Sequence, residues 1–464
     1  MGTIEVSEAA IRNCEKPCDF DDRISMSLIS ILRRYIPKPI FIAYHLALAY
    51  AANVRYRSPS DSMIVIGITG TNGKSSTVNF AAQILTTLGY KVGYTSTAGF
   101  TIAGREIVNA MKMTMPGRFA LQKLLREMVD AGCQYVIVET SSQGLVQNRH
   151  VGVNYDVGVF TNLTPEHIES HRGFENYKKA KGIFFAHLGG GKRKRMNGRI
   201  VPKVNVVNAD DEHASFYAAF SADRHMTYGF TGDQNDDHLV AHVRYPSPAG
   251  VILSVNGVDI TLPLLALFEH KNALAAIAAV VAAGIPLRDA VIAAAKLRSV
   301  PGRFETIDCG QLFTVIVDYA YEPYALLALY DSLPEHEGRV IGIHGSAGGG
   351  RDVARREKIG RLAAEHEDFV IVTNEDPYEE DPRVIIEAVA KGAREFGKVD
   401  GESLFTIDDR QEAIDFAIDH AKDGDIVLVT GKGSESVMAV KGGSVPWDDR
   451  TAVRSALAKH GYNV

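Results

Sequence analysis

The segment from Gly70 to Ser76 has the residue types and spacing of a loop that wraps the phosphates of a nucleotide. It consists of Gly70, Thr71, Asn72, Gly73, Lys74, Ser75 and Ser76. The glycines let backbone N–H groups turn toward phosphate oxygens, and the helix predicted to begin at Ser76 adds a favourable dipole. The Lys74 ammonium group would neutralise the terminal phosphates, and the Ser75 hydroxyl group could ligate magnesium. The motif therefore predicts binding of ATP with Mg²⁺.

Four further side chains are expected near that loop because they follow predicted buried strands. Glu139 ends one apolar segment, and the carboxyl ends of parallel strands face the crevice in which ligands bind. His167, His171 and Lys181 follow the next apolar segment. One strand-end carboxylate or one histidine would more often be structural, whereas two histidines together with a lysine are harder to explain in that way. The Glu139 carboxylate is an oxygen ligand suited to Mg²⁺.

Short β-branched segments that alternate with longer amphipathic ones would position these residues. The segments predicted as buried parallel strands, because they are apolar without alternation, are 63–69, 135–140, 156–163 and 203–208. Helical spacing occurs between them, at 78–88 and 118–131. This order predicts an α/β fold with a central, doubly wound and mostly parallel sheet that carries the P-loop.

A second alternation of the same kind begins after Pro301-Gly302. Its predicted strands are 314–320, 340–346, 369–375, 404–407 and 425–431, and its predicted helices include 383–396 and 410–421. This set indicates a separate, Rossmann-like α/β domain. The expected domains are a short helical N-terminal segment, a central ATP-binding domain and a C-terminal domain, with the bounds 1–60, 61–298 and 299–464.

Composition gives an ordinary globular protein of 464 residues and net charge −6, so no nucleic-acid partner is expected. Four scattered cysteines argue against a disulfide framework, and the first twenty residues lack the apolar core of a secretion signal, so a cytoplasmic enzyme is expected. The apolar stretch 39–54 is too short to span a membrane. It predicts a buried or docking helix; weak association with a membrane surface, helped by nearby arginines and lysines, is the alternative. The Gly-rich basic segment 189–203 is interpreted as a solvated connection.

A series of motifs then resembles the Mur ligases, the ATP-dependent amide-forming enzymes of peptidoglycan synthesis. In chain order they read GTNGKSS, VETSSQ, FTNLTPEH, YKKAK, NADD, FEHKNALAAIAA, VPGRFE, DYA and GKGSE. The resemblance extends from Val65 to about Arg450 and is strongest to the members that add the third amino acid of the stem peptide. It implies that a carboxylate attacks the γ-phosphoryl group of ATP, and that an amine then displaces phosphate from the acyl phosphate.

The resemblance also implies a nucleotide and metal site. Lys74 would hold the β- and γ-phosphates, Ser75 and Glu139 one Mg²⁺, and Glu139 and His167 a second. Lys181 matches the lysine that family members carry as a CO₂-derived carbamate. The remaining implied nucleotide contacts are Asn272, at the adenine, with Arg303 and Asp318 from the C-terminal domain. The implied catalytic residues are Lys74, His167, Lys181 and Arg303.

The implied substrates are a muramyl-peptide precursor and an amino acid, bound by a monomer. Thr114 matches the position that contacts the muramyl peptide, and Glu435 is the candidate for holding the incoming amine. The other residues expected to contact a substrate are Ser142, His171, Arg351, Asp376, Tyr378 and Lys432.

Several features depart from the family pattern. About sixty residues precede the P-loop, whereas the family's UDP-binding domain is larger, so the acceptor could be UDP-linked or lipid-linked. A folate- or cyanophycin-type ligase is a further alternative. A non-catalytic nucleotide-binding subunit is the third. Tyr378 stands where members that add diaminopimelate have an arginine, and a phenol cannot replace a bidentate guanidinium. The added amino acid is therefore open and includes lysine. Arg383 either substitutes for the arginine that Tyr378 replaces or starts the following helix. The other replacements, expected to retune the site, are Glu269, Tyr321 and Ser434.

Overall fold

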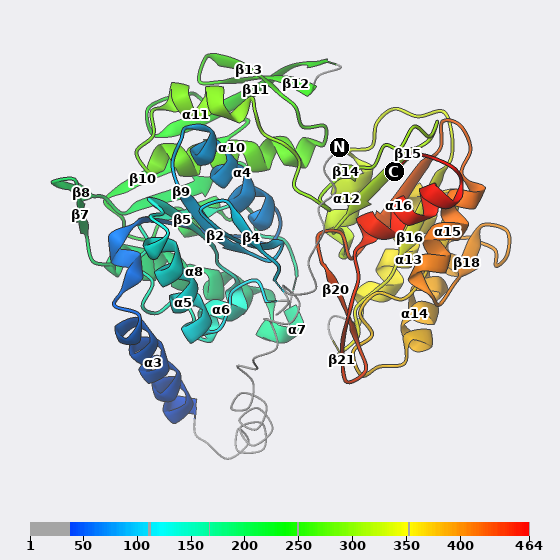
Figure 1. Cartoon of the computed structure of the whole chain (residues 1–464), viewed down its shortest axis with the longest axis horizontal. Helices are drawn as coiled ribbons and strands as arrows, with labels where there is room; N and C mark the ends of the chain where they lie inside the picture. The colour runs from blue at the N-terminus through cyan, green and yellow to red at the C-terminus, as the bar shows by residue number, and fades with distance from the viewer. Residues whose placement is uncertain (1–37, 110–112, 167, 248–249, 351–352, 464) are drawn as a thin grey trace.

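The computed structural model describes residues 38–109, 113–166, 168–247, 250–350 and 353–463. Two sheets, each covered by helices, lie side by side (Figure 1). The first has eleven strands in the order β13-β12-β11-β10-β9-β6-β1-β5-β2-β3-β4. The seven from β11 to β2 run parallel, and antiparallel strands extend both edges. The predicted doubly wound, mostly parallel sheet is confirmed.

The strands of this sheet carry the short apolar segments of the sequence. They are β1 (Ile64–Thr69), β2 (Val92–Ser96), β3 (Gly99–Ile102), β4 (Arg105–Ile107), β5 (Tyr135–Glu139), β6 (Val157–Phe160), β9 (Val204–Asn208), β10 (Arg224–Gly229), β11 (His238–Ser247), β12 (Gly250–Val255) and β13 (Val258–Leu262). The four predicted strands correspond to β1, β5, β6 and β9. The others were not predicted, because they are short or alternate with polar residues, and edge strands need no continuous apolar run.

Helices cover both faces of the first sheet. One face packs against α4 (Lys74–Thr87), α10 (Leu267–Ala282) and α11 (Leu287–Ala294). The other packs against α5 (Arg118–Asp130), α6 (Ser142–Val146), α8 (Phe174–Gly190) and α9 (Ala214–Ala218), and the short η1 (Pro59–Ser62) and α7 (Ile168–His171) lie nearby. Small side chains let α10 approach closely, since half of its buried residues are alanines. The P-loop thus connects a strand and a helix, β1 and α4, that are both packed into the core.

The second sheet has six strands in the order β14-β15-β19-β16-β17-β18, parallel except for β14. Its strands are β14 (Glu305–Thr306), β15 (Thr314–Asp318), β16 (Val340–His344), β17 (Phe369–Val372), β18 (Leu404–Thr406) and β19 (Ile426–Thr430). Its helices are α12 (Pro323–Tyr330), α13 (Arg355–His366) and α14 (Pro382–Glu395) on one face, and α15 (Arg410–His420) and α16 (Asp449–Lys459) on the other. A hairpin, β20 (Val437–Val440) and β21 (Gly443–Pro446), follows β19. All five strands predicted here are present.

The interpretation of 189–203 as a solvated connection holds for most of the segment, but two of its lysines are buried and it is not an irregular loop. Helix α8 continues to Gly190, and the rest forms the hairpin β7 (Lys194–Met196) and β8 (Arg199–Val201). The side chains of Lys194 and Lys203 are buried and both contact the buried carboxylate of Asp156. A basic sequence is thus compatible with burial when one acid neutralises it.

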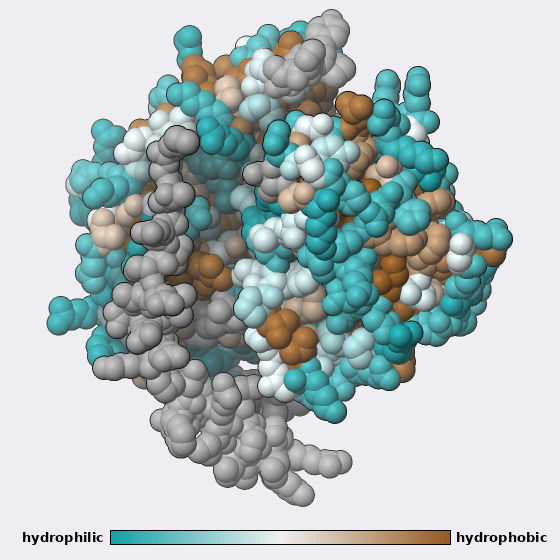
Figure 2. Space-filling view, turned by 45° about the vertical axis from the view of Figure 1, so that its right-hand side comes forward, coloured by the Kyte–Doolittle hydropathy of each residue, from teal (hydrophilic) through white to brown (hydrophobic). Residues whose placement is uncertain are grey.

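Helix α3 (Lys38–Arg55) packs on α5 through its small residues Ala49 and Ala52, which are fully buried. Its other face is exposed, with Tyr50 59% and Val54 74% accessible. Figure 1 shows the helix projecting from the body, so the expectation of a buried helix holds for one face only. None of the helices in the described part of the chain is long and apolar enough to cross a membrane. The face drawn in Figure 2 is mostly hydrophilic with small separated hydrophobic patches.

A buried histidine makes stability depend on pH. His150 and His187 pack edge to face with ring centroids 4.8 Å apart, and burial, with the charge of His187, lowers the pKa of His150 to about 3. The unfolded chain binds that proton below pH ~6.5, so this stability is complete above pH ~6.5 and is lost as pH falls toward 3. We expect the free energy of unfolding in urea to fall by up to ~1.4 kcal/mol per pH unit in that range.

The contribution of His150 is measured as a difference. In His150→Gln the slope of unfolding free energy between pH 6.5 and 5 should be shallower than in the unmodified chain, whereas His225→Gln, at an exposed position, should leave it unchanged. Equal slopes in all three proteins would show that His150 does not carry the effect.

Candidate active site

The P-loop joins β1 to α4 and lies at the carboxyl end of the first sheet. Helix α4 begins at Lys74, two residues earlier than predicted. Gly73 has φ of 79°, and a Cβ atom there would lie 2.1 Å from Asn272 Oδ1, so this turn requires glycine. Lys74 Nζ donates to Thr71 O at 2.6 Å. The loop therefore already holds its lysine across the turn that would receive phosphates.

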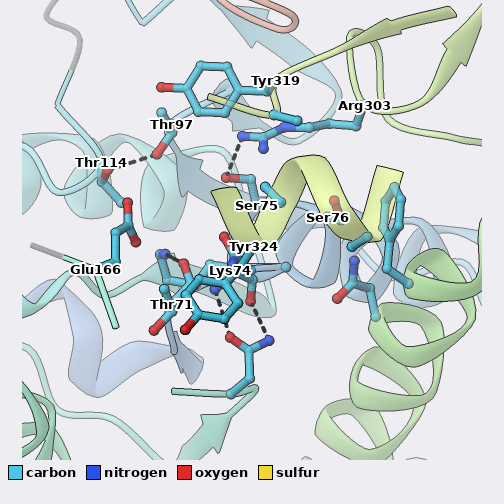
Figure 3. Close-up of a pocket in the computed structure, with 18 of the residues that line it drawn as sticks. Thr71, Lys74, Ser75, Ser76, Thr97, Thr114, Glu166, Arg303, Tyr319 and Tyr324 are labelled. Atoms are coloured by element: carbon cyan, nitrogen blue, oxygen red, sulfur yellow. Dashed lines mark hydrogen bonds between the residues drawn. The ribbon is translucent and has the colours of Figure 1, made fainter. Parts of the chain in front are cut away.

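Glu139, at the end of β5, lies beside the P-loop as expected. Ser75 Oγ donates to Glu139 Oε2 at 2.9 Å. Glu139 also accepts from Thr97 N at 2.8 Å, and the Thr97 hydroxyl group donates to Thr114 Oγ1 at 2.8 Å. Figure 3 shows Thr97, Thr114 and Ser75 along one wall of the pocket. A hydroxyl and a carboxylate oxygen thus converge at the nucleotide end, and a threonine predicted to contact substrate lies next to them.

Lys181 is fully buried in α8, and its Nζ atom donates to Gly70 O at 2.7 Å. The ammonium group also lies 4.3 Å from the centre of the Tyr177 ring. Burial, assisted by the positive charge of Lys74 and opposed by Glu166, holds the pKa of Lys181 well below its usual range. Its amine is therefore neutral far more often than that of a surface lysine.

The predicted metal ligand His167 lies outside the described residues, and so does Arg351. His171 Nε2 and Ser142 Oγ are 3.1 Å apart, so these two predicted substrate residues meet. Among the described residues, no group of three or more histidine, cysteine, aspartate or glutamate side chains could hold a metal ion alone. Magnesium that also binds nucleotide phosphates needs only one or two protein carboxylates.

Three predicted nucleotide contacts line the same cavity from other parts of the chain. Asn272, in α10, lies beside Gly73. Arg303 lies 4.2 Å from the centre of the Tyr319 ring and donates to Ser75 Oγ at 3.4 Å (Figure 3). The buried Asp318 carboxylate accepts from backbone N–H groups of the adjacent turns, and burial, opposed mainly by Arg303, raises its pKa. The cavity, about 220 Å³, is thus lined from both sheets.

A second group of predicted residues meets at the carboxyl ends of β17 and β19. The fully buried Lys432 Nζ atom lies 3.0 and 3.1 Å from the two Asp376 oxygens and also contacts Glu435. Glu435 accepts in turn from Tyr319 Oη at 3.0 Å. Tyr378 has φ of 52° and lies beside Gly349. Tyr319 therefore connects the two groups, because its ring contacts the guanidinium of Arg303.

Arg383 lies at the solvent-exposed start of helix α14. It is the second residue of α14 and pairs with Asp408 at 2.5 Å, with its side chain 71% exposed. Its position at the start of a helix is the reading that the structure supports.

The chain matches the Mur ligase middle domain over residues 68–280 and the Mur ligase glutamate ligase domain over 302–433. It is 36% identical over 417 residues to the UDP-N-acetylmuramoyl-L-alanyl-D-glutamate–2,6-diaminopimelate ligase of Geobacillus thermodenitrificans, covering 89% of this chain and 82% of the relative. The chain belongs to the Mur ligase family. The UDP-N-acetylmuramyl-tripeptide synthetase of a Roseiflexus species is 38% identical over 433 residues, with 90% and 82% coverage. A solved UDP-N-acetylmuramoyl-L-alanyl-D-glutamate–2,6-diaminopimelate ligase superposes with a TM-score of 0.54 at 28% identity, covering 86% of this chain and 79% of that one.

This Mur ligase is an ATP-dependent ligase of peptidoglycan synthesis, as the motifs predicted. Several residues that line its cavity were not singled out from the sequence, namely Thr97, Glu166, Tyr177, Phe268, Lys271, Tyr319 and Tyr324. Two of them had a recognisable pattern: Glu166 directly precedes His167, and Tyr177 stands one helical turn before Lys181. The others follow short strands or lie on a partner element, so only the fold brings them to the cavity.

Proposed function

We propose that this Mur ligase joins the amine of an amino acid to the terminal carboxyl group of a UDP-muramyl-dipeptide and converts ATP to ADP and phosphate. The observation that carries the proposal is the cavity in which Lys74, Ser75, Glu139 and Lys181 face Arg303 from the other sheet. Two relatives support it, since one is named a UDP-N-acetylmuramoyl-L-alanyl-D-glutamate–2,6-diaminopimelate ligase and the other a UDP-N-acetylmuramyl-tripeptide synthetase.

In the first step an acceptor carboxylate attacks the γ-phosphoryl group, and ADP leaves. Lys74 and the P-loop N–H groups hold the phosphates in line, and Arg303, fixed over the Tyr319 ring, neutralises charge as it develops on the phosphoryl oxygens. Thr114 and Ser142 would position the acceptor. Catalysis of this kind rests on positioning and electrostatic stabilisation more than on covalent chemistry.

The residues present fit magnesium, because Ser75 Oγ and the Glu139 carboxylate are hard oxygen donors held 2.9 Å apart. We propose that they hold one ion and that Glu139 and His167 hold a second. Bound magnesium would neutralise the phosphate charge. Lys181 fits a CO₂-derived carbamate, since burial lowers the pKa of its amine, and the neutral form of an amine can capture CO₂ and become an anionic oxygen ligand.

In the second step the amine attacks the acyl carbon and phosphate leaves. Glu435 is the candidate to hold the amine, and Tyr319 and Lys432 fix that carboxylate from two directions. Asp376 accepts from Ala439 N at 2.6 Å and from Lys432, which positions β20 against the site. We propose that residues 61–298 and 299–464 act as two domains whose closure brings the two steps together.

The test is a screen of ADP formation with UDP-muramyl-dipeptide and single amino acids. We expect one amino acid to raise the rate at least tenfold over the rate without any. Diaminopimelate should stimulate no more than lysine, which lacks its second carboxylate, because Tyr378 provides no guanidinium for that group. If no amino acid stimulates, the soluble UDP-linked acceptor is wrong.

A lipid-linked acceptor is the second candidate, and the exposed apolar face of α3 favours it. Ile40, Tyr50 and Val54 are 60%, 59% and 74% exposed there, and such a face suits the surface of a bilayer. The same screen with lipid-linked muramyl-dipeptide in detergent or vesicles distinguishes the two acceptors.

A further inference from the structure

One hydrogen bond crosses the cavity between the two sheets. Tyr321 follows β15 of the second sheet, and its Oη atom donates to Glu166 Oε1 at 2.7 Å. Glu166 follows β6 of the first sheet, is only 7% exposed and lines the cavity with Tyr321. The two residues are 155 positions apart in the chain. This contact therefore exists only while the two sheets hold their present relation.

A second contact crosses beside it. Asn72 Nδ2, in the P-loop, donates to Glu322 Oε1 at 3.0 Å. Glu322 caps α12, because its carboxylate also accepts from Tyr324 N and Ala325 N at 3.0 and 2.8 Å. The Glu322 carboxylate is thus fixed to α12. The side chain of Tyr321, the preceding residue, extends from the same short turn to Glu166.

The surroundings of Tyr321 hold its ring in place. Its ring centroid lies 5.0 Å from that of Tyr319 in an edge-to-face arrangement, and the Arg355 guanidinium lies 5.2 Å from the ring centre. Tyr319 contacts Arg303, which in turn reaches Ser75 of the P-loop. The hydroxyl group of Tyr321 is thus presented rigidly toward Glu166, so little conformational entropy is lost when the bond forms.

We propose that Tyr321 is a positioning residue that holds the two sheets closed over the nucleotide by its hydrogen bond to Glu166. The proposal rests on the proposed function only in requiring that the cavity bind ATP. Opening the cleft would separate the Tyr321 phenol from the Glu166 carboxylate. Bound nucleotide and this hydrogen bond therefore favour the same closed arrangement, and the hydrogen bond raises the affinity for nucleotide.

The test compares Tyr321→Phe, which removes one hydroxyl group, with Tyr50→Phe on the exposed face of α3. Affinity for ADP and for a non-hydrolysable ATP analogue is measured by calorimetry without acceptor or amino acid. A hydrogen bond to a buried carboxylate supports an expected loss of about tenfold in Tyr321→Phe, with KM for ATP raised equally and KM for the amino acid unchanged. Tyr321→His, which keeps a donor, should recover most of the affinity. Tyr50→Phe should bind as the unmodified chain does.

The pairing with Glu166 is tested by a double-variant cycle on nucleotide affinity. Once Tyr321→Phe is present, Glu166→Gln should lower affinity much less than it does alone. Unchanged affinity in Tyr321→Phe, or independent effects of the two changes, would overturn the proposal. Tight nucleotide binding without any amino-acid-dependent turnover would instead count against the proposed function and leave this inference standing.

Discussion

Lys181→Ala is expected to lower amino-acid-dependent phosphate release at least ~1000-fold, which corresponds to ~4 kcal/mol of transition-state stabilisation. The side chain is fully buried against the P-loop carbonyl of Gly70, so nothing else can fill its place. If it carries a carbamate, the substitution removes an anionic ligand beside the phosphates. The measurement is single-turnover phosphate release at saturating ATP, acceptor and amino acid.

The choice of variants separates a carbamate from a bare ammonium group. Lys181→Arg keeps the positive charge but cannot capture CO₂, so it should be as inactive as the alanine variant. Lys181→Glu, which restores a carboxylate, should recover part of the rate, and formate should partly rescue Lys181→Ala. Incorporation of ¹³C from labelled bicarbonate into the unmodified protein would identify the group directly.

Lys179→Ala is the matched control, because Lys179 is two residues away on the same helix and exposed. It should release phosphate at the unmodified rate. An active Lys181→Arg variant would show that the positive charge is what matters and that the carbamate assignment is wrong. A fully active Lys181→Ala variant would remove Lys181 from the site altogether.

The parts of the fold that the sequence predicted are those in which chemistry and periodicity agree. Buried parallel strands are continuous apolar runs, so β1, β5, β6 and the five parallel strands of the second sheet were recognisable. The motifs placed Ser75 beside Glu139, and the structure joins them at 2.9 Å. Both kinds of prediction depend on residues close in sequence or on strand ends that a parallel sheet must bring together.

What the sequence did not reveal depends on contacts between distant segments. Thr97 directly follows the short strand β2, and nothing local marks it as a donor to Glu139. The link from Tyr319 to Glu435 spans 116 positions, and it follows from the strand order of the second sheet. The burial of Lys194 and Lys203 within the basic segment 189–203 was not predicted for the same reason, because the acid that neutralises them lies near the start of β6.

The buried carboxylate of Asp156 is the basis of the second prediction. Asp156→Ala is expected to lower the free energy of unfolding by about 3–5 kcal/mol. Asp156 Oδ2 accepts from Lys194 Nζ at 2.5 Å and from Val65 N at 2.9 Å, and Oδ1 accepts from Lys203 Nζ at 3.0 Å. All three charged side chains are almost fully inaccessible. Removing the carboxylate leaves two ammonium groups buried without a counter-charge, which is far more costly than losing a surface pair.

Urea unfolding at pH 7 measures the effect, with Asp259→Ala as the control. Asp259 pairs with Arg244 at 3.7 Å, and the side chains are 58% and 54% exposed, so its loss should cost less than ~1 kcal/mol. The loss of unfolding free energy in Asp156→Asn should lie between those of the two alanine variants, because the amide can still accept from Val65 N but cannot neutralise the lysines. If the two alanine variants lose the same free energy of unfolding, the buried lysines become hydrated or lose their protons at little cost.

The same variant separates stability from catalysis. Asp156 precedes β6, whereas Thr161 and Asn162, which contact the P-loop, follow its other end. At a temperature where Asp156→Ala stays folded, we therefore expect KM for ATP within about twofold of the unmodified value, since distant sites rarely couple. A large rise in KM without loss of folded protein would show that this ion cluster holds the P-loop side of the sheet in register as well as the hairpin β7–β8.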